Sequence, residues 1–380
     1  MLTFVTSLPI PDIVFNGVGA PFPPQHRVFA PSIDVSGDSL FSVSSWIESY
    51  QTQHQNLPMA FLIPGISITS AGDAFFNGDP DQPATGTTPF YLSEIKSLQK
   101  LVSQIGFSFR GENALDGSRE SSRLAGIYKR VLDVYHVSWI DIFFNTHVLT
   151  NDTAVAVIVG AVGELQSQYS VLESKSRLKV TFSFALDESL ARLSNDTIKL
   201  LYLSSKKGLV VDSVVAVMRK SESNGSAVLE ARDTDKTSVE DILLPQVKVG
   251  ERRIREFHGN RRDLGTGRKG RFGITVVEGV SAKDGTLNAS GYAIQVLKAM
   301  WTQVKPFQNV AGVGFMPMIG STGSTKKENG NAVVSKPFQV SDALELAVWG
   351  KANKWVTFLG LLGVNEDVEG SYTDALNHFR

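Results

Sequence analysis

Residues 138–145 (Ser-Trp-Ile-Asp-Ile-Phe-Phe-Asn) end an apolar run and contain a single acid, Asp141. The amide of Asn145 and the imidazole of His147 follow within six residues. Because an amide has no proton to give at neutral pH, Asn145 cannot act as a general acid, a role that contributes roughly 10²–10⁴-fold to a rate. A lone His without a second His or carboxylate at ligand spacing is a poor metal site. The segment therefore predicts neither acid catalysis nor a metal centre.

Eight apolar runs rich in β-branched and aromatic residues alternate with amphipathic stretches along the chain. Such runs are typical of parallel strands buried on both faces, and eight of them suggest closure into a barrel. We therefore expect an α/β fold, a (β/α)8 TIM barrel. The strand runs are 27–35, 57–66, 105–110, 139–144, 178–186, 209–218, 310–319 and 356–364. The helical stretches are 39–53, 90–103, 118–135, 152–174, 195–207, 287–304 and 340–353, with Asn195 and Ser341 as expected N-caps.

Three segments break this rhythm. Residues 1–26 are rich in Pro and Gly and are interpreted as an arm leading into a barrel over 27–380. Residues 67–89 follow the second strand, on the face where barrel loops form binding sites. Residues 219–286 follow the sixth strand and are too long for a bare loop, so we expect a partly ordered insertion subdomain there.

The bulk composition limits the function classes. The 380 residues include 42% hydrophobic and 20% charged residues, ordinary for a globular protein with a core, and the net charge is −1. With a net charge this close to zero, the protein has no overall electrostatic field that would attract nucleic acid or an anionic membrane. The chain has no cysteine, which excludes disulfides and thiolate chemistry. We expect no membrane span, no signal peptide and no cofactor, and a cytoplasmic location is favoured.

The strand motif and its neighbours resemble glycoside hydrolase family 18, the chitinases, whose fourth strand carries D-x-x-D-x-D-x-E. Ser138, Asp141, Phe143 and Asn145 fill the four acidic positions of that pattern, and only Asp141 is an acid. Further pieces in the right order resemble the other strands. They are residues 29–35, 59–63, 106–111, 178–186, 208–218, 315–320 and 358–367. The resemblance covers most of 27–367 and implies a barrel of the chitinase type.

The resemblance also implies a degenerate site. Family 18 enzymes use one Glu as general acid and the N-acetyl oxygen of the substrate as nucleophile, assisted by an Asp two residues before the Glu. Here these positions are Asn145 and Phe143, and the strand 6 Asp and Tyr fall among 219–221, which are Arg, Lys and Ser. The Trp expected on strand 8 is Leu361 or Leu362. We therefore expect an inactive barrel, with Phe143 narrowing the sugar pocket.

Other groups follow the strands and could lie at the mouth of the barrel. Glu112, Asp187, Glu188, Glu366 and Asp367 are candidates for a relocated acid, although ordinary loop and capping roles are favoured for all five. The ligand-binding candidates share a place on or after strands 3, 4 and 7. They are Arg110, Glu112, Asp141, Asn145, His147 and Met318.

A basic stretch lies within the insertion. Between residues 248 and 271 it holds nine basic and three acidic side chains, a net charge of +6. A solvated loop is one interpretation, and a docking surface for an acidic protein or an identical subunit is the other. Few aromatic residues are available to stack on bases, which disfavours nucleic acid. The partner-binding candidates are Arg252, Arg253, Arg255, Arg261, Arg262, Arg268, Lys269 and Arg271.

These observations predict a catalytically inactive chitinase-like protein with a structural, self-assembling or protein-binding role. The favoured partner is another protein or a second copy of the chain. Two alternatives stay open at this point. One is a lectin-like binder of chitin or other N-acetylglucosamine glycans, and the other is a hydrolase whose acid has moved to another loop.

Overall fold

The computed structural model describes residues 27–33, 35, 42–53, 60–102, 104–114, 120–171, 177–185, 193–217, 289–317, 327–328, 331–332, 338–364, 367 and 369–380. The arm (1–26) and the insertion (219–286), with all eight basic partner candidates, lie outside these residues. So do Met318, Asp187, Glu188 and Glu366. The predicted division into arm, barrel and insertion therefore stays a prediction.

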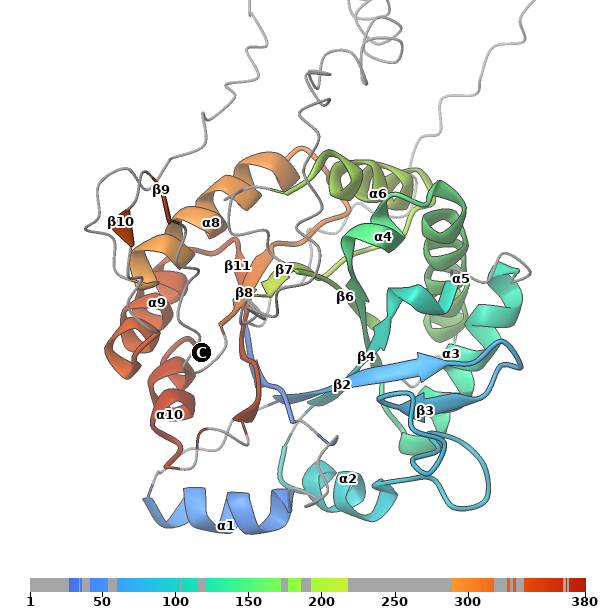
Figure 1. The fold of residues 1–380 in the computed structure, drawn as a ribbon, viewed down its shortest axis with the longest axis horizontal. Coiled ribbons are helices and arrows are strands. Elements are labelled where there is room, and N and C mark those ends of the chain that lie inside the picture. Colours follow the sequence, from blue (N-terminus) through green and yellow to red (C-terminus); the bar gives the residue numbers. More distant parts are fainter. Residues whose placement is uncertain are drawn as a thin grey trace, which may run out of the picture.

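A curled nine-stranded sheet forms the centre of the molecule, with its strands in the order β1-β11-β8-β7-β6-β5-β4-β2-β3. All neighbours pair in parallel except β3, which is antiparallel to β2. A parallel bridge between Ser32 and Leu62 joins β1 to β2, and the Ile33 amide donates to the Leu62 carbonyl at 2.9 Å. The sheet thus curls round so that its first and second parallel strands meet, and the helices form an outer ring (Figure 1). The predicted α/β barrel fold is confirmed.

The parallel strands follow the predicted runs closely, and β5 matches its run to the residue. They are β1 (Val28–Pro31), β2 (Ala60–Ile68), β4 (Gln104–Arg110), β5 (Trp139–Phe144), β6 (Lys179–Ala185), β7 (Ser213–Val217), β8 (Val313–Met316) and β11 (Val356–Leu361). The agreement follows from the composition of the runs, since β-branched and aromatic side chains suit a sheet that is covered on both faces.

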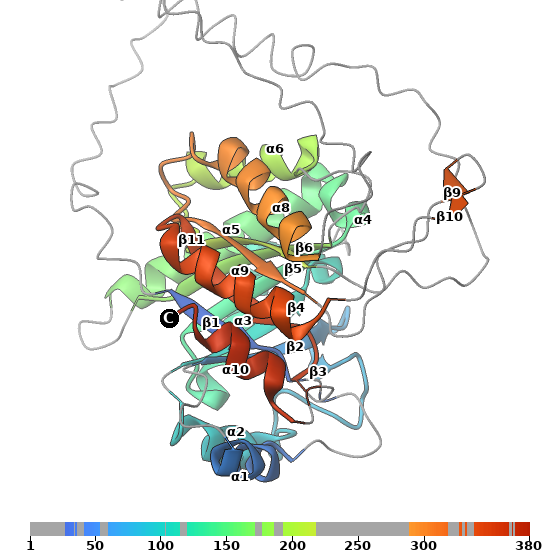
Figure 2. The same cartoon turned by 90° about the vertical axis from the view of Figure 1, so that its left-hand side faces the viewer.

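The seven predicted helices are also present within the described residues. They are α1 (Val43–Gln53), α2 (Leu92–Gln99), α3 (Ser121–Tyr135), α5 (Asp152–Val171), α6 (Asn195–Lys206), α8 (Ala289–Val304) and α9 (Val340–Ala352). Both predicted N-caps were wrong by one or two residues. Ser194 caps α6 by accepting from the backbone N–H of Thr197 at 3.1 Å. α9 begins after Gln339, whose backbone N–H donates to the Asp342 carboxylate at 3.0 Å. Figure 2 shows α8, α9 and α10 side by side on one flank.

Short elements escaped the sequence reading because they are set by local turns and tertiary contacts rather than by periodicity. They are β3 (Ala74–Phe76), η1 (Gly111–Ala114), α4 (Thr146–Leu149), the pair β9 (Lys327–Glu328) and β10 (Asn331–Ala332), and α10 (Ser371–Asn377). β3 lies in the predicted 67–89 insertion and pairs with the end of β2, so this loop is a hairpin rather than open chain.

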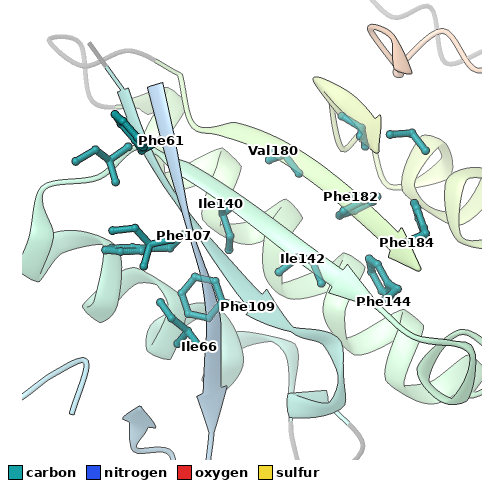
Figure 3. Packing of buried hydrophobic residues seen from close by; sticks show 14 of the residues in the cluster. Phe61, Ile66, Phe107, Phe109, Ile140, Ile142, Phe144, Val180, Phe182 and Phe184 are labelled. Carbon is teal, nitrogen blue, oxygen red and sulfur yellow. The ribbon is translucent and has the colours of Figure 1, made fainter. Parts of the chain in front are cut away.

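Two apolar clusters hold the fold together, one on each side of the sheet. The larger lies between strands and helices and takes Ile140, Ile142 and Phe144 from β5 (Figure 3). The smaller contains Trp139 and residues of five other strands, with Phe143 packed against it, so it fills the interior of the barrel. This division is the period-two alternation of a strand, and it places the odd-numbered residues of β5 inside.

Glycines make room for the large side chains inside the barrel. A Cβ on Gly106 would lie 2.4 Å from the Trp139 ring, and one on Gly360 would lie 2.6 Å from the Met316 methyl. Trp139 and Phe358 meet edge to face at 6.0 Å. Large and glycine positions on facing strands therefore interdigitate, which gives a packed interior rather than a pore.

Candidate functional site

The strand β5 presents the motif positions at different depths of the barrel. Trp139 and Phe143 belong to or contact the interior cluster, and Asp141 lies between them on the same face. Asn145 follows the strand at its carboxyl end, where barrel enzymes place their chemistry. Ser138 precedes the strand, at the opposite end of the barrel. The structure therefore separates Ser138 from the other three positions.

Asp141 is the centre of a buried polar network. Only 1% of its surface is exposed, and its carboxylate accepts hydrogen bonds from Ser108 (2.6 Å), Thr181 (2.6 Å) and Ser183 (2.7 Å). Thr181 in turn accepts from the Trp139 indole at 3.2 Å. Burial raises the pKa of Asp141, and the three hydroxyl donors oppose that rise. The carboxylate thus ties β4, β5 and β6 together, and its predicted ligand role stays a prediction.

Asn145 is the residue that the resemblance to family 18 places at the proton-donor position. Its side-chain oxygen accepts from the Val148 amide at 2.9 Å and so caps α4. Its side-chain nitrogen donates to the carboxylate of Glu112 in η1. The oxygen satisfies an otherwise unpaired N–H in the first turn of α4, as N-cap residues do, and the nitrogen is bonded to Glu112. The residue acts here as a structural link between η1 and α4.

The remaining candidates surround the mouth. Arg110, Glu112 and His147 are exposed, whereas Phe143 is half-buried. In the sheet register Phe143 pairs with Arg110 on one side and with Ser183 on the other. The structure therefore brings these groups to one end of the barrel, with an aromatic ring projecting among polar residues.

Three residues considered for other roles have defined places in the structure. Asp367, a candidate for a relocated acid, is buried and accepts from the amides of Tyr372 (3.2 Å) and Thr373 (2.7 Å) at the start of α10. It has the geometry of the capping role favoured from the sequence. Of the two residues expected at the family's Trp position, Leu361 packs in the outer core and Leu362 contacts the interior cluster.

The sequence reading missed Lys179 at the start of β6. Its Nζ is buried, has no hydrogen-bond partner, and lies 4.1 Å from the centre of the Trp139 ring. Burial lowers its pKa to about 8, the Asp212 carboxylate opposes that shift, and Arg177 adds to it. The available signal was a Lys at the start of an apolar run, a pattern common at exposed strand ends.

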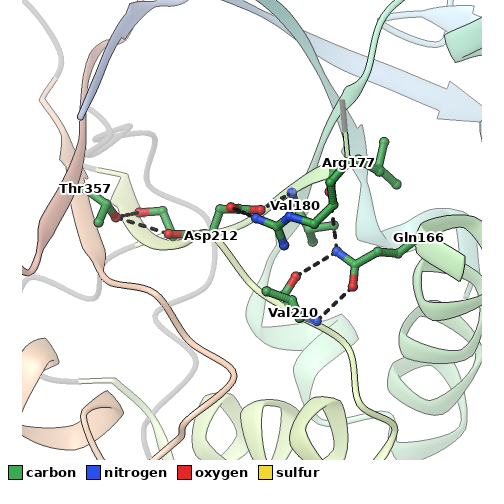
Figure 4. A network of polar contacts seen from close by, with 8 residues as sticks. Gln166, Arg177, Val180, Val210, Asp212 and Thr357 are labelled. Atoms are coloured by element: carbon green, nitrogen blue, oxygen red, sulfur yellow. Dashed lines mark hydrogen bonds and ion pairs between the residues drawn. The ribbon is translucent and has the colours of Figure 1, made fainter. Parts of the chain in front are cut away.

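A polar network surrounds this end of the barrel (Figure 4). Asp212 accepts from Arg177 and from the Val180 amide, the latter at 2.8 Å. The Gln166 side chain accepts from the Val210 amide at 2.9 Å and donates to the Val210 carbonyl at 3.0 Å. These bonds satisfy backbone groups where strands begin, so the network positions β6 and β7 relative to α5.

The described residues also bear on metal binding and membrane insertion. They contain no group of three or more His, Cys, Asp or Glu side chains placed to hold a metal ion. In the same residues, no helix is both long enough and apolar enough to cross a bilayer.

The curled parallel sheet with its outer ring of helices defines an α/β barrel. The catalytic domain of a hyperthermophilic chitinase from Pyrococcus furiosus is similar in structure, with a TM-score of 0.57 over 94% of this chain and 96% of that one, at 14% identity. Catalytic-site mutants of active domain 2 of a thermostable chitinase from the same organism, complexed with chito-oligosaccharides, give 0.55 over 90% and 85%, at 15% identity. No family model and no curated protein matches the sequence. The likeness therefore establishes a chitinase-like fold.

Proposed function

We propose that this chain is a catalytically silent chitinase-like barrel that acts by binding another protein or a second copy of itself. The observation that carries the proposal is the double engagement of Asn145, as N-cap of α4 and as donor to Glu112. An amide held in this way supplies no proton to a glycosidic oxygen.

Two neighbours of Asn145 support the same conclusion. Phe143 stands at the position of the assisting Asp, and a benzyl side chain cannot stabilise the positive charge that develops on the substrate. Asp141 is the remaining acid of the motif, and three hydroxyls already occupy its oxygens. In this proposal the barrel fold is kept, Phe143 and Asn145 replace two catalytic acids, and Asp141 has a structural role in joining strands.

The first experiment tests hydrolysis with a fluorogenic chitooligosaccharide. We expect no turnover above background from purified protein, and the same result from Glu112→Gln and Asp187→Asn. The matched control is the Phe143→Asp, Asn145→Glu double variant, which returns both acids to the motif and is expected to gain some turnover if the rest of the cleft still admits a sugar. Wild-type turnover that Glu112→Gln abolishes would refute the proposal in favour of a relocated acid.

The second experiment tests the binding role through self-association. Light scattering of the full chain over a wide concentration range is expected to show assembly, which weakens at high salt if the basic insertion takes part. The matched variant replaces Arg252, Arg253 and Arg255 by Gln and is expected to reduce association. A monomer at every concentration would remove the support for self-assembly.

A competing function is binding of a chitin-type glycan at the barrel mouth. It is favoured by the chito-oligosaccharide complex of the similar Pyrococcus furiosus domain. Phe143 stands against it, because it narrows the space that a sugar ring would occupy. Calorimetry with N-acetylglucosamine oligomers decides between the two, and Phe143→Ala is the informative variant, since removing the ring should increase affinity if the mouth binds sugar.

A further inference from the structure

A cavity of about 310 Å³ lies at the amino-terminal end of the strands, away from the mouth. It is formed where α2 ends, where β4 begins, and where α3 leads into β5. Its lining residues are Gln99, Val102, Gln104, Ile105, His136, Val137, Ser138 and Trp139. β5 alone separates this end from Asn145, and its six residues span roughly 20 Å. The cavity therefore includes Ser138, the first motif position, and is separate from Phe143 and Asn145 at the barrel mouth.

The cavity has an apolar floor and a polar rim. Val102, Ile105 and Val137 are buried, with at most 9% of their surfaces exposed. Gln99 and Ser138 are half-buried, while Gln104 and His136 are exposed. Most of the lining surface that faces the cavity is polar, which suits a ligand that forms several hydrogen bonds.

Two rim residues are held in place by the surrounding backbone. The Gln99 side chain donates to the Tyr135 carbonyl at 2.6 Å, which fixes the amide over the end of α3. His136 ends α3 with φ of 54°, and its backbone N–H donates to the carbonyls of Leu132 and Asp133. A non-glycine residue at positive φ is uncommon, so the direction of His136 is imposed by the helix end rather than chosen freely.

The chemistry of the rim selects the class of ligand. Amide, hydroxyl and imidazole groups each offer both donors and acceptors. None of the lining residues carries a carboxylate, ammonium or guanidinium group, and His136 is the one lining side chain that can take a positive charge. The volume is at the lower end of the range for ligand sites, which fits one sugar ring rather than a chain. We propose that this cavity binds a neutral polyhydroxylated molecule the size of a monosaccharide.

The test is ligand-observed saturation-transfer NMR on the full chain with glucose and N-acetylglucosamine, beside glucose 6-phosphate and glucosamine as charged analogues. We expect transfer to the neutral sugars and at least tenfold weaker binding of the charged ones. Gln104→Leu and Ser138→Ala should each weaken binding of the neutral sugars at least fivefold. Gln168→Leu, on the surface of α5 and outside the lining, is the matched control and should leave it unchanged. Arg110→Gln reports on binding at the barrel mouth instead.

Melting temperatures of the variants separate a lost contact from a lost fold. Gln104 is exposed at a strand start, so Gln104→Leu should melt within a few degrees of wild type, and a folded variant that still binds as wild type overturns the proposal. Absence of transfer to every neutral sugar overturns it too. Loss of transfer in Arg110→Gln alone would show that the sugars bind at the barrel mouth and would also overturn the cavity proposal. The proposed function is tested separately, by the hydrolysis and self-association experiments.

Discussion

At the scale of single residues, two buried titratable groups lie at different depths of the same barrel, and their pKa values are shifted in opposite directions. Asp141 has three hydroxyl donors, whereas the Lys179 amine has no hydrogen-bond partner and lies over the face of the Trp139 ring. Burial disfavours the charged form of both, which raises the pKa of the acid and lowers that of the amine. Their contributions to stability therefore depend on pH in different windows.

Lys179→Met is expected to stabilise the protein at neutral pH. Below about pH 8 the folded protein holds a buried ammonium that the unfolded chain solvates, and the unfolded chain keeps its proton up to its ordinary pKa of 10.5. The unfolded state thus binds more protons between those values, and wild-type stability rises with pH across that window. At pH 7 the variant should gain on the order of 3 kcal/mol, since the pKa is lowered from 10.5 to about 8 and one pKa unit is worth about 1.4 kcal/mol.

The measurement for Lys179→Met is urea unfolding at pH 7 and at pH 10, with Lys199→Met as control. Lys199 is a half-exposed lysine with an ion-pair partner at 3.0 Å, so its loss should change little at either pH. An equal effect of the two substitutions would show that burial of the Lys179 amine carries no penalty.

Asp141→Asn is expected to remove a fall in stability that wild type shows as pH rises from about 4. Because the folded pKa lies above the ordinary value of 3.8, the native state binds more protons than the unfolded chain in the window between them. Stability therefore decreases with rising pH there and is greatest below the unfolded pKa. Ser183→Ala should steepen the fall, since it removes a donor that favours the ionised form. Unfolding free energies between pH 4 and 7 test this, and identical slopes in all three proteins would contradict it.

At the scale of elements, α9 has one face in the core and an apolar stripe facing outward. Val340, Leu344 and Val348 are 38%, 42% and 57% exposed, while Leu346 is fully buried. The helix is thus apolar on both sides, and its sequence pattern alone does not show which leucine supports the fold.

Leu344→Lys and Leu346→Ala make a matched pair on this helix. The first should change the free energy of unfolding by less than about 0.5 kcal/mol, because the side chain is exposed. The second should cost about 2–4 kcal/mol through the cavity that it leaves. Denaturant midpoints of the two variants check the assignment, and a larger loss from Leu344→Lys would mean that the stripe is covered in solution.

At the scale of the whole molecule, the barrel depends on glycines that admit large side chains. Gly106→Ala should destabilise by about 1–3 kcal/mol, as overpacking does, since the new methyl would meet the Trp139 ring. Gly163→Ala in α5 has nothing within 4 Å of its added methyl and should stabilise by about 0.5–1 kcal/mol through helix propensity. Thermal melts of both proteins give the comparison. An unchanged melting temperature of Gly106→Ala would show that the interior has room for the added methyl group.

Much of the fold could be predicted from local pattern. The run 139–144 became β5 without change because apolar residues on both faces suit only a doubly covered strand. The N-caps were less predictable, since Ser194 and Asn195 are both good capping residues and the choice depends on one backbone turn. α10 was missed because its start depends on the buried Asp367.

The sequence by itself determined the α/β alternation and placed an amide rather than an acid at position 145. The absence of hydrolysis is predicted from that amide. Only the tertiary structure decided that Asp141 is held by hydroxyls from β4 and β6, and that Asn145 links η1 to α4. It alone also placed Lys179 on Trp139 without a partner and brought the ends of α2 and α3 together around a cavity. Periodicity and side-chain type act over a few neighbouring residues, whereas hydrogen-bond partners and burial arise from strands that lie far apart in the chain.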